Sequence, residues 1–437
     1  MDEAGRGKPA APGPEVKARL VMVGIGSGAI QLGLWSLYAA KSGMKIVLAE
    51  VDAGKVGAIR KNGNRYSINI AHYDRIEGVT VGPVEIYNPG IPSERRRIVA
   101  ALSVANDIVT AVPAVSIYET GGVGNLLREG LSSRDPKRPA AVYASENQVG
   151  AARILEKLVF PEGRPACIRF LDTVIERMGG PHFDRAFIGK LGLKRLTRGS
   201  LEAFLVEDFD RIVVEAHRIK GGFRSGFARF QAVREIGVYE ERKLYGHNAV
   251  HSLLGFLGKM KGYRYMSQYG GDPDFGLVGV DALRYETGGW FKPKYAKSGE
   301  ETATEAGYEV WVEGLCRRIV NPYLYDLVDR VARDPGRKLA WDDRLAGVMR
   351  NALAAGIVPR RYALGVAAGI ILTGSKAETK RTALSRLAGM WNKGDRRTEG
   401  KLLTLVGTAH DAVRGWSGRG SLYAHLEKTR YFNSHAG

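Results

Sequence analysis

Cysteine is almost absent from this sequence, which has only Cys167 and Cys316 among 437 residues. Two cysteines cannot form a disulfide framework or a cysteine-rich zinc site, so we expect a reducing, cytoplasmic setting. Long apolar runs are also missing, because Tyr362–Thr373 is too short to cross a bilayer. Residues 1–17 have no apolar stretch of the signal-peptide kind and are rich in Pro, Gly, Ala and charge. They are expected to form a disordered tail.

Acidic residues are fewer than basic residues. The chain has 46 Asp and Glu and 65 Lys and Arg, which gives a formal net charge of +19. Such an excess predicts a polyanionic partner or a phosphorylated substrate. The basic residues are spread along the whole chain without a zinc-finger, KH or RRM pattern, so nucleic-acid binding is the less favoured alternative. Apolar residues at 44% and charged residues at 25% exclude a wholly disordered chain. The 56 glycines follow no three-residue period, which excludes a collagen-like chain.

A glycine-rich turn follows the first apolar run of the chain. The run Arg19–Val23 leads into the sequence GIGSGA at residues 24–29, and a buried helix is expected over Ile30–Ser42. A glycine-rich turn between a strand and a helix lets backbone N–H groups approach a pyrophosphate, and the helix N-terminus adds a partial positive charge. The order strand, turn and helix therefore predicts a dinucleotide site.

Four residues of this turn and one acid beyond it are expected to hold the cofactor. Gly24 is expected to permit the tight turn, Gly26 to let the backbone approach the phosphates, and Ala29 to pack closely on the strand. Ser27 lies between them. Glu50 ends the second predicted strand, where a carboxylate accepts hydrogen bonds from ribose hydroxyls and repels a 2′-phosphate. We predict NAD(H) over NADP(H); an ordinary glycine-rich turn with an incidental acid is the alternative.

Short apolar strands alternate with helical stretches in the N-terminal half, and helices dominate afterwards. The alternation predicts a doubly wound, Rossmann-type α/β domain over residues 18–222. A mostly α-helical substrate and catalytic domain is expected over residues 223–437, with a basic extension from about residue 375 and loose order after Trp416. The expected strands are Lys45–Glu50, Asp107–Val112 and Ala140–Ala144, and the expected helices are Tyr239–Gly258, Glu305–Arg333, Asp342–Gly356 and Arg360–Leu372.

A second group of polar residues lies in the first of these helices. Asn248 and His251 are three residues apart and share a helix face, and Lys243 precedes Asn248 by five residues. A desolvated Lys beside a cofactor can act as a general base, and Asn and His can hydrogen-bond a developing alkoxide. The alternative is a partly exposed amphipathic helix. A zinc pair of His247 and His251 is disfavoured, because no third ligand can be identified, and we predict no metal.

Together the two motifs resemble the polyol-specific long-chain dehydrogenases. That family has a Lys, an Asn five residues later and a His three residues beyond, as at Lys243, Asn248 and His251. Further similar segments follow in the same order over roughly residues 19–370, and the last resembles the sugar-phosphate branch of the family. These segments are Ser145-Glu146-Asn147, Phe170–Met178 and Asn321–Leu345. Glu176 departs from the Asp that is usual in the family.

The resemblance implies metal-independent hydride transfer between NAD(H) and a polyol or sugar, with mannitol 1-phosphate and fructose 6-phosphate as the expected pair. Lys243 would be the general acid and base, and Asn248 and His251 would hold and polarise the reacting oxygen. Glu240 and Glu241 are candidates for passing the proton to solvent, with a solvated helix face as the alternative.

The resemblance also implies substrate contacts. Asn147 is an expected contact to substrate or nicotinamide. Arg330 and Lys338 are eight residues apart, the spacing at which the family places a substrate-binding Arg and Lys. Arg344 is a further candidate for a phosphate, which guanidinium groups bind in bidentate fashion. Surface charge is the alternative for this basic group.

Three other functions stay open at this stage. The first is a dehydrogenase of unphosphorylated polyols, or a uronate reductase, on the same scaffold. The second is a scaffold without activity, which the intact Lys243, Asn248 and His251 set disfavours. The third is the nucleic-acid-binding protein named above. A small-molecule sugar or polyol phosphate is the expected partner, and a membrane is not.

Overall fold

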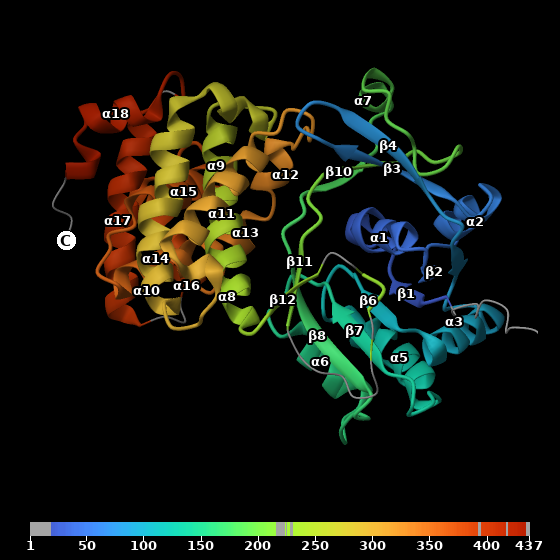
Figure 1. Ribbon diagram of the computed structural model, residues 1–437. Coiled ribbons are helices and arrows are strands. Elements are labelled where there is room, and N and C mark those ends of the chain that lie inside the picture. The colour runs from blue at the N-terminus through green and yellow to red at the C-terminus, as the bar shows by residue number, and fades with distance from the viewer. Residues whose placement is uncertain are drawn as a thin grey trace, which may run out of the picture.

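A computed structural model describes residues 19–215, 223, 225–227, 230–391, 395–416 and 418–433. It has an N-terminal α/β region followed by a mostly helical region (Figure 1). The expected fold class is therefore confirmed. The predicted tail over residues 1–17 and the predicted domain boundary at residue 222 lie outside the described residues, so the domain limits stay a prediction. Among the described residues, none of the helices combines the length and the apolar character needed to cross a bilayer.

The N-terminal region is built on an eight-stranded sheet with the order β12-β11-β8-β7-β6-β1-β2-β5. All neighbours are parallel except β8 and β11. The central strands are almost wholly buried, as expected of a parallel sheet covered on both faces. The strands are β1 (Val21–Ile25), β2 (Lys45–Ala49), β5 (Glu85–Tyr87), β6 (Asp107–Thr110), β7 (Ala140–Ala144), β8 (Ile168–Ile175), β11 (Ile212–Glu215) and β12 (Phe230–Val233).

Helices cover both faces of this sheet, which makes it doubly wound. One face packs against four helices, α3 (Pro92–Val104), α4 (Ile117–Thr120), α5 (Val123–Ser132) and α6 (Ala151–Val159). The other face packs against a π-helical segment, η1 (Gln31–Trp35), against α1 (Ser36–Lys41) and against α2 (Ala53–Lys61). The predicted helix over Ile30–Ser42 is thus present, but it contains a π-helical segment at Gln31–Trp35.

A second, four-stranded sheet lies over α1 (Figure 1). Its order is β4-β3-β10-β9, and its strands are β3 (Tyr66–Ala71), β4 (Ile76–Val81), β9 (Gly179–His182) and β10 (Ala203–Glu207), with α7 (Arg185–Lys190) between the last two. The Tyr66 hydroxyl donates to the carbonyl oxygen of Leu32 at 2.9 Å, which ties this sheet to η1. The sheet was not predicted from the sequence, because β3 and β10 pair across more than a hundred residues.

The C-terminal region centres on α15 (Arg360–Thr373), which packs against α9 (Asn248–Met260), α14 (Arg344–Ala354) and α17 (Arg396–Gly415). The segments α8 (Ile236–Glu241), η2 (Arg242–His247) and α9 (Asn248–Met260) form one continuous rod that includes the predicted helix. The remaining helices are α10 (Gly288–Tyr295), α11 (Glu305–Ile319), α12 (Val328–Ala332), α13 (Pro335–Lys338), α14 (Arg344–Ala354), α16 (Lys380–Trp391), α17 (Arg396–Gly415) and α18 (Leu422–Lys428). Short helical segments are η3 (Met266–Gly271), η4 (Phe275–Val280), η5 (Ala282–Thr287), η6 (Glu301–Ala303) and η7 (Tyr431–Asn433).

Two predictions about these helices are wrong. The single helix expected over Glu305–Arg333 is split into α11 and α12, because Pro322 lacks the N–H that a continuing helix needs. The chain after Trp416 is not loosely ordered throughout. It forms α18, which begins at the N-cap Ser421 and is held by Asp274.

Candidate functional site

The glycine-rich turn lies where β1 meets the first helix. Gly26 has a φ of 93°, in the region that favours glycine, and its N–H donates to the Ala49 carbonyl at 2.9 Å. A Cβ atom at Gly26 would lie 2.7 Å from the carbonyl oxygen of Ala111. The turn opens into a cleft of about 560 Å³ lined by Gly26, Ser27, Gly28, Ala29 and Glu50, here called the glycine-turn cleft.

The role predicted for Gly24 is wrong. Gly24 lies inside β1, where it pairs with Leu48 and Val109, and it does not make the turn. A Cβ atom at Gly24 would lie 2.3 Å from the Gln31 side chain. Gly24 therefore leaves room for the Gln31 side chain of the first helix against the strand, and Gly26, with its positive φ, lies in the turn.

Glu50 follows β2 directly and lines the glycine-turn cleft. The Ser27 hydroxyl donates a short hydrogen bond to its carboxylate, and the Asp52 N–H donates to the other carboxylate oxygen at 2.8 Å. The structure thus brings Ser27 and Glu50 together at the carboxyl ends of neighbouring parallel strands. This is the edge of a doubly wound sheet at which ligands bind.

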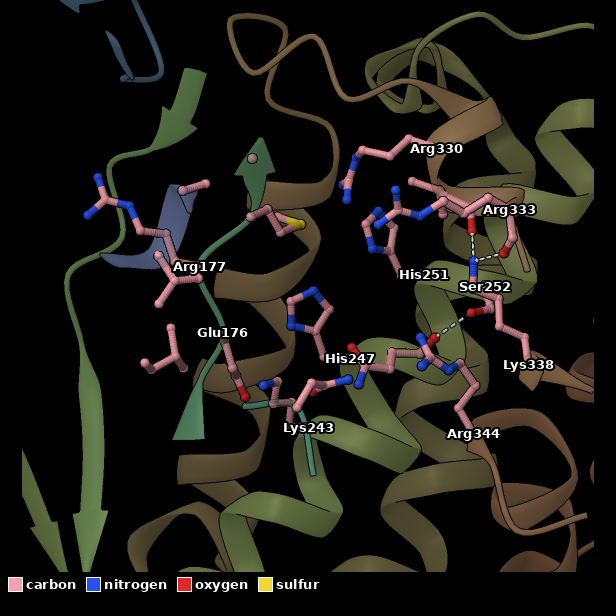
Figure 2. Close-up of a pocket in the computed structure, with 18 of the residues that line it drawn as sticks. Glu176, Arg177, Lys243, His247, His251, Ser252, Arg330, Arg333, Lys338 and Arg344 are labelled. Carbon is pink, nitrogen blue, oxygen red and sulfur yellow. Dashed lines mark hydrogen bonds between the residues drawn. The ribbon is translucent and has the colours of Figure 1, made fainter. Parts of the chain in front are cut away.

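A second cleft of about 380 Å³, here called the lysine cleft, adjoins the first. Ala29, Ile30 and Ser145 line both, so the two spaces meet at the start of the first helix. The predicted residues Lys243, Asn248 and His251 all line the lysine cleft. Figure 2 shows Glu176 and Arg177 on one side of the cleft and Arg330, Arg333, Lys338 and Arg344 on the other, with His247 and His251 between them.

A π turn gives Lys243 and Asn248 a common face. The Asn248 N–H donates to the carbonyl oxygen of Lys243, five residues earlier. Residues five apart are then close to one turn apart, which an α-helical period of 3.6 does not give. Gly246 permits Trp311 to approach the turn, since a Cβ atom there would lie 2.5 Å from the Trp311 ring. The sequence offered only this glycine as a sign of the irregular turn.

Burial is the largest influence on Lys243. It lowers the pKa of the ammonium to about 8, with Arg344 acting in the same direction and with Glu176 and Glu240 opposing it. Both protonation states of Lys243 are therefore accessible near neutral pH, as a general acid and base requires.

Glu176 is the carboxylate that lies on the opposite side of the cleft. It is buried, with the Arg242 Nη2 atom at 3.1 Å, the Trp311 Nε1 atom at 3.3 Å and the Arg318 Nη1 atom at 3.5 Å. Burial acts to raise its pKa, but the charges of Arg242 and Arg318 prevail and lower it to about 2. Glu176 is therefore an anion, and it provides negative charge beside Lys243.

His251 is linked to Arg330 through Asp326, a residue that was not predicted from the sequence. The His251 Nε2 atom lies 3.1 Å from Asp326 Oδ2, and Arg330 Nε donates to Asp326 Oδ1 at 2.7 Å. Burial acts to raise the pKa of Asp326, but Arg330 and His251 lower it to about 2. No sequence signal marked Asp326, which lies in the loop after Pro322. Burial also lowers the pKa of His247, so that ring is neutral.

Five cations form one side of the lysine cleft, here called the basic wall: Arg330, Arg333, Arg337, Lys338 and Arg344. Three of them were predicted from the sequence, and Arg333 and Arg337 were missed. Asp343 fixes Arg344 by accepting a hydrogen bond from the Arg344 Nε atom at 2.7 Å. Lys338 Nζ donates to the carbonyl oxygens of Val331 and Arg333. Burial first, and then the neighbouring arginines, lower the pKa of Lys338 to about 7.

The two acids ahead of Lys243 have different surroundings. Asn147 and Glu240 line a third cleft of about 340 Å³, which shares Lys243 and Asn248 with the lysine cleft. Burial and the charge of Asp172 raise the pKa of Glu240 to about 7. Glu241 instead pairs with Lys294 at 2.7 Å, on the outer side of the rod. Of the two candidates for a proton path, only Glu240 borders the site.

Comparison with known proteins supports the family resemblance. The family model of the mannitol dehydrogenase C-terminal domain matches residues 235–387. Mannitol-1-phosphate 5-dehydrogenase of Caldanaerobacter subterraneus subsp. tengcongensis is 27% identical over 350 residues, which cover 79% of this chain and 84% of that protein. Its counterpart from Exiguobacterium sp. is 28% identical over 353 residues, which cover 80% and 84%. The resemblance to the polyol dehydrogenases is confirmed.

Solved structures of polyol dehydrogenases have the same fold. Mannitol 2-dehydrogenase of Pseudomonas fluorescens, solved with NAD and D-mannitol, aligns with a TM-score of 0.71 and 14% identity over 95% of each chain. A D-sorbitol dehydrogenase aligns with a TM-score of 0.70 and 15% identity over 92% of this chain and 94% of that one. At this level of identity the likeness concerns the fold.

Proposed function

We propose that this chain interconverts a polyol phosphate and a ketose phosphate, mannitol 1-phosphate and fructose 6-phosphate, with NAD(H) as cofactor and Lys243 as general acid and base. The coarser statement, a polyol dehydrogenase that uses NAD, follows from the family match and the relatives. One observation supports the finer proposal: Lys243 and the basic wall line the same cleft, and this cleft adjoins the glycine-turn cleft at Ala29, Ile30 and Ser145.

The glycine-turn cleft fits a dinucleotide. A Cβ atom at Gly26 would clash with the Ala111 carbonyl oxygen, so glycine is needed at this position of the turn. The backbone of residues 26–29 leads into a helix N-terminus, which favours binding of a phosphate group. Glu50 would accept hydrogen bonds from the adenosine ribose, and its charge would repel a 2′-phosphate. Bound NAD would supply the hydride acceptor in oxidation, and NADH the hydride donor in reduction.

Lys243 would move the proton. In oxidation its neutral amine would take the proton of the substrate hydroxyl, while a hydride leaves the carbon that bears this hydroxyl. In reduction its ammonium returns that proton to the carbonyl oxygen. Asn248 and His251 would hold this oxygen, and Asp326 would orient the His251 ring. Glu240, with a pKa of about 7, would pass the proton between Lys243 and solvent.

The basic wall would bind the phosphate group. Arg330 and Arg344 are held by Asp326 and Asp343, so their guanidinium groups are oriented before substrate arrives. Lys338 adds a buried ammonium, and Asn147 lies at the junction of the clefts as a substrate or nicotinamide contact. A uronate carboxylate would also suit these cations, which keeps the uronate reductase as the second candidate.

A substrate panel tests the proposal. Oxidation of NADH is followed with fructose 6-phosphate, fructose and a hexuronate. We expect kcat/KM for the phosphorylated ketose to exceed that for fructose by about 100-fold or more, since two or three charged hydrogen bonds are lost with the phosphate. Lys338→Ala should remove much of this difference, and Lys259→Ala, which changes an exposed lysine paired with Asp329, should not. A preference for fructose or the hexuronate would contradict the phosphate assignment.

A further inference from the structure

A short segment at the junction of two helices carries three of the five cations of the basic wall. Residues 337–344 comprise the last two residues of α13, the connection to α14 and the first residue of α14, and Arg337, Lys338 and Arg344 line the lysine cleft. Two residues between them, Leu339 and Trp341, are instead buried in the helical core. Because most of the segment is not helical, side chains behind it must fix its position.

Trp391 contacts this segment from behind. It is the last residue of α16, its ring is fully buried, and its Nε1–H donates to the carbonyl oxygen of Leu339 at 2.7 Å. Its ring also packs edge-on against Trp341, with ring centroids 5.5 Å apart. The hydrogen bond therefore holds the peptide group that lies one residue after Lys338.

Helix α15 supports the segment from another direction. A Cβ atom at Gly369 would lie 3.0 Å from Leu339 and 3.1 Å from Phe256, so this glycine lets α15 approach closely. On the cleft side, Lys338 Nζ donates to two carbonyl oxygens, those of Val331 and Arg333. An ammonium has three donors, so one remains to point at an anion in the cleft. The direction of that donor depends on where the backbone of residues 338–339 is held.

We infer that Trp391 is a positioning residue for phosphate selectivity, an inference that rests on the proposed function. Trp391 touches no substrate and acts through Leu339 on Lys338. The family model ends at residue 387, four residues before Trp391, so this position lies outside the matched domain. The end of α16, which lies beyond the family match, would thus have a defined role, because it fixes the segment that selects the phosphorylated substrate.

The test compares Trp391→Phe with Trp416→Phe. Both tryptophans are buried, and Trp416 donates to the Arg419 carbonyl at 3.1 Å and lies beside Lys261, with 5.7 Å between the Lys261 Nζ atom and the ring centroid. Trp391→Phe should raise the KM for fructose 6-phosphate about tenfold, the effect of one lost hydrogen bond to a buried carbonyl. The KM for fructose, kcat and the Kd of NADH should stay unchanged. Trp416→Phe should leave all four unchanged.

Several results would overturn the inference. An unchanged KM ratio for the two ketoses in Trp391→Phe would do so, as would equal shifts in both tryptophan variants. Trp391→His retains a ring N–H and should recover part of the preference for fructose 6-phosphate over fructose. If Trp391→His and Trp391→Phe lose this preference equally, the effect comes from the volume of the ring and the inferred hydrogen-bond role is wrong. Should Trp391→Phe fail to fold, Trp391→His is compared with wild type by the same ratio. A wild-type enzyme without phosphate preference would instead contradict the proposed function itself.

Discussion

Lys243 owes its proton affinity to opposing influences that act on one side chain. Burial favours the neutral amine, whereas Glu176 and Glu240 favour the ammonium. The resulting pKa of about 8 lies close to neutral pH, where a group can both accept and return a proton. The buried anion Glu176 is held by two arginines and a tryptophan, so it remains charged over the whole working range.

The first prediction concerns pH. Reduction of the ketose needs the ammonium form of Lys243, so its rate should fall as pH rises through about 8. Oxidation of the polyol needs the neutral amine, so its rate should rise through the same range. The measurement is kcat/KM in both directions from about pH 6 to about pH 10. Profiles that move in the same direction would contradict the assignment of one group to both roles.

The second prediction concerns Glu50 and the preference for NADH over NADPH. Glu50→Ala removes the carboxylate that would repel a 2′-phosphate, so the ratio of kcat/KM for NADH to that for NADPH should fall about tenfold or more. The reference variant is Glu241→Ala, which changes an acid on the outer side of the α8–α9 rod. An unchanged ratio in Glu50→Ala would show that another group selects the cofactor.

At the scale of elements, the sequence predicted local patterns well and irregular turns poorly. The strands that became β1, β2, β6 and β7 and the helices that became α14 and α15 each follow from a continuous apolar pattern. The π turns of η1 and η2 could not be predicted, because they depend on packing against distant residues such as Trp311. The role of Gly24 was also predicted wrongly, because the spacing of glycines along the sequence does not reveal that Gly24 packs against Gln31.

A third prediction tests the turn. Gly26→Ala places a Cβ atom 2.7 Å from the Ala111 carbonyl at a positive φ, so it should lower the free energy of unfolding by about 1–3 kcal/mol. Gly28→Ala is the matched control, since nothing lies within 4 Å of its Cβ position. Thermal unfolding of the two variants without cofactor measures the difference. Equal Tm values would contradict the role of Gly26 in the turn.

At the scale of the whole molecule, the site exists only where the two regions meet. Glu176 and Glu207 of the α/β region bind Arg318 of α11, which fixes β8 and β10 against the helices. Such pairings join residues more than a hundred positions apart. The site residues could therefore be predicted from the sequence, but the cleft that they form together could not. The family resemblance, rather than spacing, brought Arg330 and Lys338 into the predicted site. The excess positive charge is partly explained, because the five cations of the basic wall line the lysine cleft together with Arg177 and Lys243.

The fourth prediction concerns the anchor of the C-terminal helices. Asp274 is buried, pairs with Lys261 at 2.5 Å and accepts hydrogen bonds from Ser421, Leu422 and Tyr423 at the start of α18. Asp274→Ala should lower the free energy of unfolding by about 3 kcal/mol, because it leaves a buried ammonium with fewer partners. Asp411→Ala, which removes an exposed pair with Lys380, should cost less than about 1 kcal/mol.

These contacts also give the effect a pH dependence. Burial raises the pKa of Asp274, but Lys261 and the donors of α18 outweigh it and lower the pKa overall. A carboxyl group with a lowered pKa stabilises the fold at neutral pH and loses this contribution as pH falls through the folded pKa. The difference between wild type and Asp274→Ala should therefore shrink in acid. A difference that is constant down to low pH would contradict the ionic anchor.

The most direct measurement is the comparison of wild type with Lys243→Ala in NADH binding and in turnover with fructose 6-phosphate. Both proteins should bind NADH with the same Kd, because the glycine-turn cleft is unchanged. Turnover should fall by about 10²–10⁴-fold in the variant, the usual contribution of a positioned general acid and base. Turnover in Lys243→Ala near the wild-type rate, or wild-type protein that does not bind NADH, would contradict the account.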